Sequence, residues 1–286
     1  MGLDASVMCN CFRLGRTSEP PVPREWLHID NDGYWSLKPE HDSDDLFYKV
    51  YEWEQTCCEH PEMRYASEHI ANWAGYRLFQ QALGRVGWER FPVFDHELPH
   101  ANGGQMEAVT AALALRELDE FRRVTDVGSN VCLVDTATGE VIQEHVAVYE
   151  GRFILSGQSG LHAGLDRTGF FIRDHGTKAE LFRATRFRQT ILDPDSDPYG
   201  PEPSLVRFED LDTGRTVECR IAVCGKAIPW PGGRMQDDKG RYGFDRPAEL
   251  HVEVRAERST DYEYILGPLE RVFRASVDTG NPVRWG

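Results

Sequence analysis

The chain has 286 residues, of which 40% are hydrophobic and 28% charged, and it carries a formal net charge of −15. This composition is typical of a globular protein with one large or two ordinary domains. The acidic balance disfavours nucleic acids and anionic lipid surfaces as partners, and it favours attraction to a basic protein. No stretch approaches the ~20 apolar residues of a membrane span.

The first residues predict a strand. Within residues 3–14, the side chains of Ala5, Val7, Cys9 and Cys11 fall on one face of an extended segment, because neighbours two positions apart in a strand point the same way.

A small hairpin and a helix are expected next. Residues 26–29 and 34–37 lie on either side of a turn rich in Asp and Gly, a pattern that favours two short paired strands. Acidic residues around Ser43 predict a helix start. That helix should end near Cys57, because a proline follows at Pro61 and the residue before a proline resists helical geometry.

Two more helices are predicted before residue 125. One runs from Ile70 to Gly84 or Gly87, and the other covers residues 106–123, which are rich in Ala and Leu. The apolar stripe expected on the second of these is formed by Val109, Leu113, Leu118 and Phe121.

From residue 126 to residue 258 the pattern changes to short β-prone segments separated by turns. The predicted strands cover residues 131–134, 141–149, 152–155, 170–173, 180–188, 205–210, 216–223 and 250–256. Two of the turns end in Thr138-Gly139 and Thr213-Gly214. They indicate either two similar hairpins or a weak internal repeat.

The chain returns to a helix near its end. Pro268 suits a first helical turn, and Gly280 suits the end of the helix. The predicted core stripe consists of Leu269, Val272, Phe273 and Ser276.

These elements predict an α+β fold with two parts. A helical layer surrounds a small N-terminal sheet in residues 1–125, completed by residues 259–286. Residues 126–258 form an inserted antiparallel β module of sandwich or open-barrel type.

Four short motifs resemble a family of uncharacterised bacterial proteins. They are the opening Met1-Gly2-Leu3-Asp4, the pair Cys9-x-Cys11-Phe12, Cys58-x-His60, and the ending Ser276-Val277-Asp278-Thr279-Gly280-Asn281-Pro282. The resemblance covers residues 1–123 and 260–286 and implies that the β module is an insertion. It implies no activity and no catalytic residues. Cys57 and the middle region depart from the family pattern.

The cysteines carry the clearest chemistry. Seven cysteines, an odd number, without a visible secretory signal predict a reducing, cytoplasmic setting with free or metal-bound thiols. Cys9, Cys11, Cys58 and His60 supply three sulfurs and one nitrogen, the ligand types of a closed structural zinc site. Such a site would tie the first strand to the end of the first helix. Buried free thiols are the alternative, because cysteine packs readily in cores.

Catalytic motifs are broken or absent, so the sequence predicts no catalytic or cofactor-binding residue. Gly157-Gln158-Ser159-Gly160 is one residue short of a nucleophile elbow and is predicted to be a glycine-rich loop. Residues 193–198 imitate the start of a calcium loop but place Pro198 where that loop needs Gly, so a surface loop is expected.

Three functions are compatible with these observations. The first is a non-catalytic cytoplasmic binding protein, of the immunity or defence-associated kind, for a basic protein partner. The second is a hydrolase-type enzyme with a Cys/His/Glu site near residue 60. The third is a scaffold or assembly subunit that uses the β module for contacts.

Overall fold

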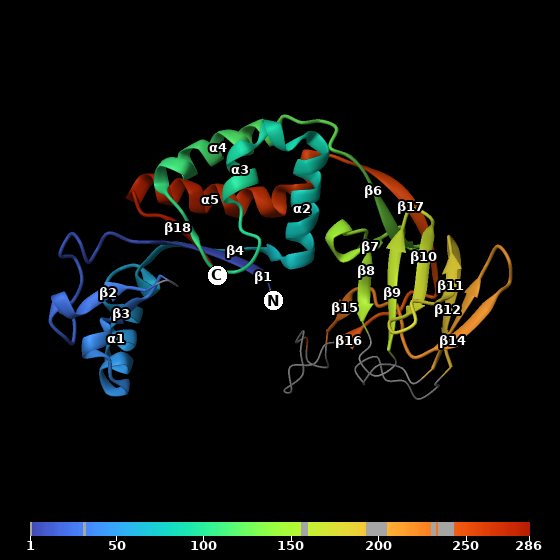
Figure 1. The fold of residues 1–286 in the computed structure, drawn as a ribbon, viewed down its shortest axis with the longest axis horizontal. Helices are drawn as coiled ribbons and strands as arrows, with labels where there is room; N and C mark the ends of the chain where they lie inside the picture. Colours follow the sequence, from blue (N-terminus) through green and yellow to red (C-terminus); the bar gives the residue numbers. More distant parts are fainter. Residues whose placement is uncertain (1, 31–32, 156–159, 193–204, 230–232, 234–242) are drawn as a thin grey trace. The chain divides into compact units, whose positions relative to one another are not determined.

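The computed structural model describes residues 2–30, 33–155, 160–192, 205–229, 233 and 243–286. The loops predicted at residues 157–159 and 193–198 lie outside these ranges. The chain divides into two compact units, residues 1–128 with 258–286 and residues 129–257 (Figure 1). The predicted α+β class is confirmed. In the part of the chain that is described, no helix is long and apolar enough to cross a membrane.

The first unit is built on an antiparallel sheet with the strand order β4-β1-β18-β5. Its strands are β1 (Gly2–Met8), β4 (Arg64–Asn72), β5 (Gln105–Met106) and β18 (Val283–Trp285). One face of β1 buries Leu3, Ala5 and Val7, and the helices lie on this side of the sheet (Figure 1). The other face of β1 presents Asp4 and Ser6.

Four helices lie on the buried side of this sheet. They are α2 (Trp73–Val86), α3 (Pro92–Glu97), α4 (Ala108–Arg122) and α5 (Glu263–Thr279). Helices α2 and α5 pack on the strands, and α3 and α4 form a further layer (Figure 1). A network of aromatic rings joins them, formed by Phe79, Phe91, Phe94, Phe121 and Phe273. The stripe predicted on α5 is fully buried, and Gly280 ends this helix with a φ of 72°, a left-handed conformation that glycine adopts without strain.

The face predicted for α4 is half wrong. Leu118 and Phe121 are buried, but Val109 is 75% exposed and Leu113 is 43% exposed. The helix instead buries Ala111 and Ala114. Small alanine side chains let a helix approach its neighbours closely, so the strongly hydrophobic Val and Leu positions were a poor guide to the packed face.

Other predicted boundaries also need correction. The first strand ends at Met8, so Cys9 and Cys11 lie in the turn that follows it and not on a strand face. Residues 64–72 form strand β4, although the second helix was predicted to include Ile70. Most side chains of β4 are polar and have weak β-propensity, so the sequence does not show the alternation of apolar and polar residues that indicates a strand. The last helix begins at Glu263, so Pro268 lies inside it and not in its first turn.

The hairpin and first helix were predicted correctly. Strands β2 (Leu27–Ile29) and β3 (Trp35–Leu37) pair antiparallel. Helix α1 (Asp44–Thr56) follows, with Ser43 as its N-cap and Cys57 as its C-cap. These elements share a small core of their own, which includes Val50, Trp53, Met63 and the cysteines of the N-terminal region.

The second unit consists of antiparallel sheets. Its main strands are β6 (Gly128–Asp135), β7 (Val141–Glu144), β8 (Arg152–Leu155), β9 (Leu161–Asp166), β10 (Gly169–Asp174), β11 (Glu180–Ala184), β12 (Arg186–Ile191), β13 (Val206–Asp210), β14 (Thr216–Cys219) and β17 (Glu249–Glu257), with the short pair β15 (Ala227–Ile228) and β16 (Gly243–Phe244). The two larger sheets have the orders β11-β10-β9-β8 and β14-β13-β12-β17-β6-β7.

One core joins these two sheets. Phe170 and Phe182 from the first sheet pack on Phe187 and Phe208 from the second, and the rings of Phe170 and Phe187 are stacked with centroids 4.4 Å apart. Two open sheets around a shared core make a sandwich, one of the two predicted alternatives. Strand β9 was not predicted.

Candidate metal centre

Three thiols from two distant parts of the chain meet in the first unit. The Sγ atoms of Cys9, Cys11 and Cys58 all lie within 4.8 Å of one another. The Sγ atoms of Cys9 and Cys58 are 3.8 Å apart. Cys9 and Cys11 are buried and Cys58 is half-buried. This geometry could hold a metal ion.

A tight turn after β1 places the first two thiols. Arg16 N–H donates to the Cys11 carbonyl (2.8 Å) and Leu14 N–H to the Asn10 carbonyl (2.9 Å), so the chain folds back on itself directly after the strand. As a result the N–H of Cys11 points at the Sγ of Cys9, 3.5 Å away. An N–H donor favours the thiolate form of a cysteine, which is the form that binds metals.

The third thiol is placed by the end of α1 and the turn before β4. Cys58 follows the C-cap of the helix. Two backbone hydrogen bonds join the two segments that carry the thiols. Cys9 N–H donates to the Met63 carbonyl and Ser18 N–H donates to the Cys57 carbonyl, each with an N···O distance of 2.7 Å. These two bonds bring the segments that carry the thiols together.

The turn itself is strained. Glu62 and Met63 both have a φ of 53°, in the left-handed region that residues with a side chain rarely adopt. Such strain costs about 1–3 kcal/mol per residue and is often found at functional sites. Here it directs the chain from His60 sharply into β4.

Burial favours the neutral form of the Cys9 and Cys11 thiols. It raises the pKa of Cys9 to about 12, and it also raises the pKa of Cys11. A metal ligand must be deprotonated, so binding of a cation at these thiols has to release protons. Metal affinity should therefore increase with pH.

The predicted fourth ligand, His60, lies near one of the three thiols. His60, Glu59 and Cys11 form a second group, whose ligand atoms are also within 4.8 Å of one another. The Nε2 of His60 is 3.8 Å from Glu59 Oε1. Of the four predicted residues, Cys9, Cys11 and Cys58 come together, whereas His60 lies near Cys11 but does not form one group with all three thiols. Glu59 was not among the predicted ligands, and its position next to Cys58 and His60 is the signal that could have included it.

Cys57 belongs to neither group, although it precedes Cys58 in sequence. Its thiol lies 3.9 Å from the Glu54 carbonyl, to which it donates, and it is buried, which raises its pKa to about 12. Cys57 is therefore a core residue at the end of α1. It provides a matched control for substitutions at Cys58.

No family model matches this chain, and neither the curated proteins nor the solved structures contain a significant match. The resemblance to a bacterial family stays a prediction.

Proposed function

We propose that this protein is a non-catalytic binding protein, in which a structural zinc ion at Cys9, Cys11 and Cys58 fixes helix α1 to strand β1. The observation that carries the proposal is the meeting of three thiols from sequence positions about fifty residues apart, with their Sγ atoms within 4.8 Å of one another. His60 supplies the fourth ligand.

The chemistry of the ligand set supports zinc. Thiolate and imidazole ligands suit zinc, whereas calcium and magnesium need oxygen ligands. Zn–S bonds of about 2.3 Å in a tetrahedron separate the sulfurs by about 3.8 Å. The distance between Cys9 Sγ and Cys58 Sγ is also 3.8 Å. The burial of Cys9 and Cys11 favours a closed structural site over a catalytic one, which needs an open position for water.

Substitution of one thiol tests the centre. The protein, purified without chelator and under reducing conditions, should contain about one zinc per chain by elemental analysis. Cys58→Ser should lose this zinc. Its free energy of unfolding should fall by about 3–4 kcal/mol at a free zinc concentration several hundred times the Kd, because a ligand that binds only the folded state stabilises it by mass action.

Cys57→Ser is the control for this experiment, since its thiol lies outside the cluster. It should retain the zinc, with only the smaller loss expected of a core substitution. Metal-free wild-type protein, or equal zinc loss in both variants, would contradict the proposal.

The surface for a partner is the exposed side of α1. Phe47, Tyr48 and Tyr51 are 44%, 64% and 47% exposed there, and aromatic side chains are frequent binding hot spots. The exposed carboxylates of Asp44 and Glu52 lie on the same helix. Together with the net charge of −15, they favour a basic protein partner, such as the toxin that a cytoplasmic immunity or defence factor would neutralise.

Loss of two of these rings should abolish partner binding. In affinity capture from cells of the source, the wild type should retain a basic protein, in a salt-sensitive manner, that the Tyr48→Ala/Tyr51→Ala variant does not retain. Val109→Ala, which trims an even more exposed apolar side chain on α4, is the control and should behave as the wild type. Capture that is unaffected by the α1 substitutions would exclude this surface.

One observation favours an enzyme as the second candidate. Cys11, Glu59 and His60 lie close enough to form a nucleophile, base and orienting carboxylate. Against this, burial raises the pKa of the Cys11 thiol, whereas a catalytic cysteine needs a lowered pKa. His60→Ala separates the two functions. An enzyme would lose its activity with unchanged stability, whereas loss of a zinc ligand would lower metal content and stability together.

A further inference from the structure

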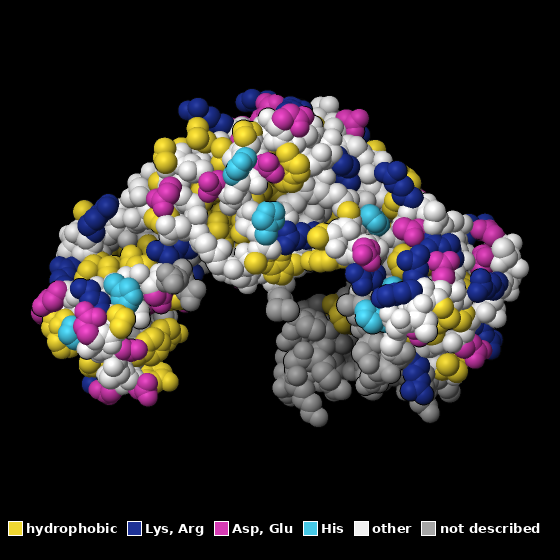
Figure 2. Space-filling view, in the orientation of Figure 1, with side chains coloured by type: hydrophobic (Ala, Val, Ile, Leu, Met, Phe, Trp, Pro, Cys, Tyr) yellow, Lys and Arg dark blue, Asp and Glu magenta, His cyan; other side chains and the backbone are white. Residues whose placement is uncertain are grey.

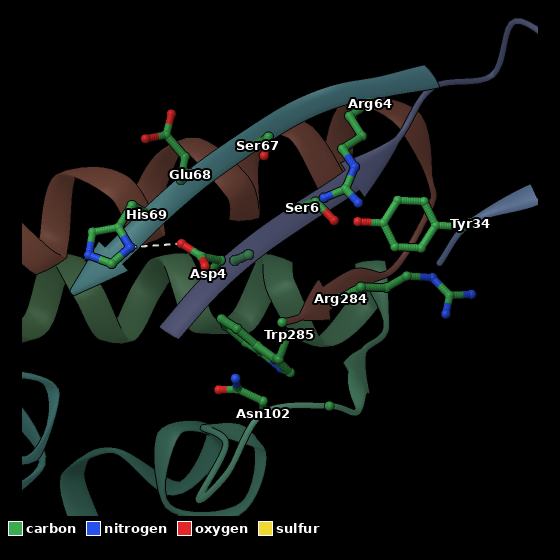
Figure 3. A pocket seen from close by; sticks show the side chains of 13 residues that line it. Asp4, Ser6, Tyr34, Arg64, Ser67, Glu68, His69, Asn102, Arg284 and Trp285 are labelled. Atoms are coloured by element: carbon green, nitrogen blue, oxygen red, sulfur yellow. Dashed lines mark hydrogen bonds and ion pairs between the residues drawn. The ribbon is translucent and has the colours of Figure 1, made fainter. Parts of the chain in front are cut away.

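A polar pocket lies on the face of the first sheet that the helices leave uncovered (Figure 3). Its volume is about 620 Å³, within the usual range for sites of small molecules. Strands β1, β4 and β18 form its floor. Tyr34, which precedes β3, and residues 102–103, which precede β5, contribute to its walls.

The strand register aligns polar side chains across this floor. Ser6 on β1 is paired with Ser67 on β4 and with Arg284 on β18. Residues opposite one another in an antiparallel sheet have side chains on the same face, about 5 Å apart. Ser6 is only 8% exposed, and its hydroxyl makes no hydrogen bond with any residue that the structure describes.

Arg64 and Tyr34 close one end of the pocket. The Arg64 guanidinium carbon lies 4.7 Å from the centre of the Tyr34 ring. In Figure 3 the guanidinium, the Tyr34 hydroxyl and the Ser6 hydroxyl point toward one another. The Nε of Arg64 is buried and lacks a hydrogen-bond acceptor among the described residues. Its ion-pair contact is Glu62 Oε2 at 3.3 Å, in a geometry that forms no hydrogen bond.

The carboxylates that line the pocket already have partners. Asp4 Oδ1 lies 2.7 Å from Nδ1 of His69. Both oxygens of Glu68 accept hydrogen bonds from Arg271, at 2.7 and 2.8 Å. Arg284 donates a hydrogen bond to the Asp30 carbonyl, with an N···O distance of 3.1 Å. Its guanidinium adds a second positive charge beside the pocket. Donors therefore exceed available acceptors at the end formed by Ser6, Tyr34 and Arg64.

We propose that this pocket binds a small molecule through a carboxylate or phosphate group, which Arg64, Tyr34 and Ser6 hold by hydrogen bonds. Arginine is well suited to this role, because its planar guanidinium can donate two parallel hydrogen bonds to one oxyanion. The ligand's oxyanion supplies the acceptors that the three donors lack. Hydrogen-bond donors that lack acceptors bind an oxyanion more tightly than a neutral ligand of the same size.

Calorimetric titration of the full chain tests this site. The probes are inorganic phosphate and, in a separate titration, succinate, both in chloride buffer, so that the two sources of the oxyanion are distinguished. At least one probe should bind saturably with a Kd in the millimolar range or below. Arg64→Gln should weaken this binding about tenfold or more, because it removes a charged donor.

Tyr34→Phe is a second variant that tests the site even if Arg64→Gln does not fold. It removes only the hydroxyl and keeps the ring beneath the guanidinium. It should weaken binding by about three- to tenfold. Arg274→Gln, at an exposed arginine of α5 outside the pocket, is the control and should bind as the wild type. Absence of saturable binding of both probes, or a Tyr34→Phe affinity equal to that of the wild type, would overturn the proposal.

Discussion

The fold tolerates the charge of the buried Glu54 carboxylate on α1 poorly. It is 1% exposed, and its Oε1 accepts a hydrogen bond from Trp35 N–H at 3.1 Å. Its Oε2 has no hydrogen-bond partner among the described residues. Burial raises the pKa of Glu54 to about 7, and the hydrogen bond and the charge of Arg64 offset this only in part. At pH 8 the folded protein therefore carries a poorly solvated negative charge.

Glu54→Gln should stabilise the protein at high pH only. The pKa of Glu54 is higher in the folded state than its ordinary value of 4.5, so the folded state binds more protons and the wild type loses stability as the pH rises from about 4.5 to about 7. Urea denaturation should show a small difference between variant and wild type at pH 5, and a gain of about 1–3 kcal/mol at pH 8. Glu52→Gln, at an exposed position of the same helix, is the control. An equal effect of Glu54→Gln at both pH values would argue against an ionised buried carboxylate.

At the level of elements, the sequence predicts those structures whose signals are local. Ser43 and Cys57 mark the ends of α1, and the hairpin of β2 and β3 follows from the turn between them. Strand β4 was missed because its side chains are mostly polar, and it gains its stability from pairing with β1, a partner distant in sequence. The metal centre was also predicted only in part. The sequence shows the cysteine motif, but it does not show the turn after Met8 that brings the thiols together.

The pocket was beyond sequence reasoning for a related reason. Ser6, Tyr34 and Arg64 come from three separate segments, and none of them belongs to a motif. The register of β1 against β4 and β18 brings the polar positions into line, and a shift of one residue would move them to the buried face.

Helix α3 depends on a side chain from another element. The carboxylate of Glu117 on α4 accepts hydrogen bonds from Val93 N–H (2.8 Å) and Phe94 N–H (2.9 Å), two donors that the start of α3 cannot satisfy itself. Glu117→Ala should lower the free energy of unfolding by about 1–3 kcal/mol, because these N–H groups lose their acceptor. Thermal or urea denaturation measures this loss. Asp119→Ala, at an exposed position of the same helix, should change stability by less than about 0.5 kcal/mol, and a comparable loss in both variants would rule out this capping role.

At the level of the whole molecule, the two units have separate cores, and the candidate chemistry lies in the first. The sandwich core of the second unit is built from phenylalanines on both sheets. The first unit holds the thiol cluster, the exposed rings of α1 and the polar pocket. The acidic charge of the chain as a whole suits the basic partner that we propose for the α1 surface. The proposed zinc ion would fix the helix that carries this surface.

X-ray absorption at the zinc edge of the purified protein reports the atoms that bind the metal. A zinc ion held by the three thiols and His60 should have three sulfur neighbours at about 2.3 Å and one nitrogen at about 2.0–2.1 Å. Cys58→Ser should abolish this signal, and Cys57→Ser should leave it unchanged. A zinc ion surrounded only by oxygen and nitrogen, or protein that binds no zinc, would contradict the proposed thiol centre.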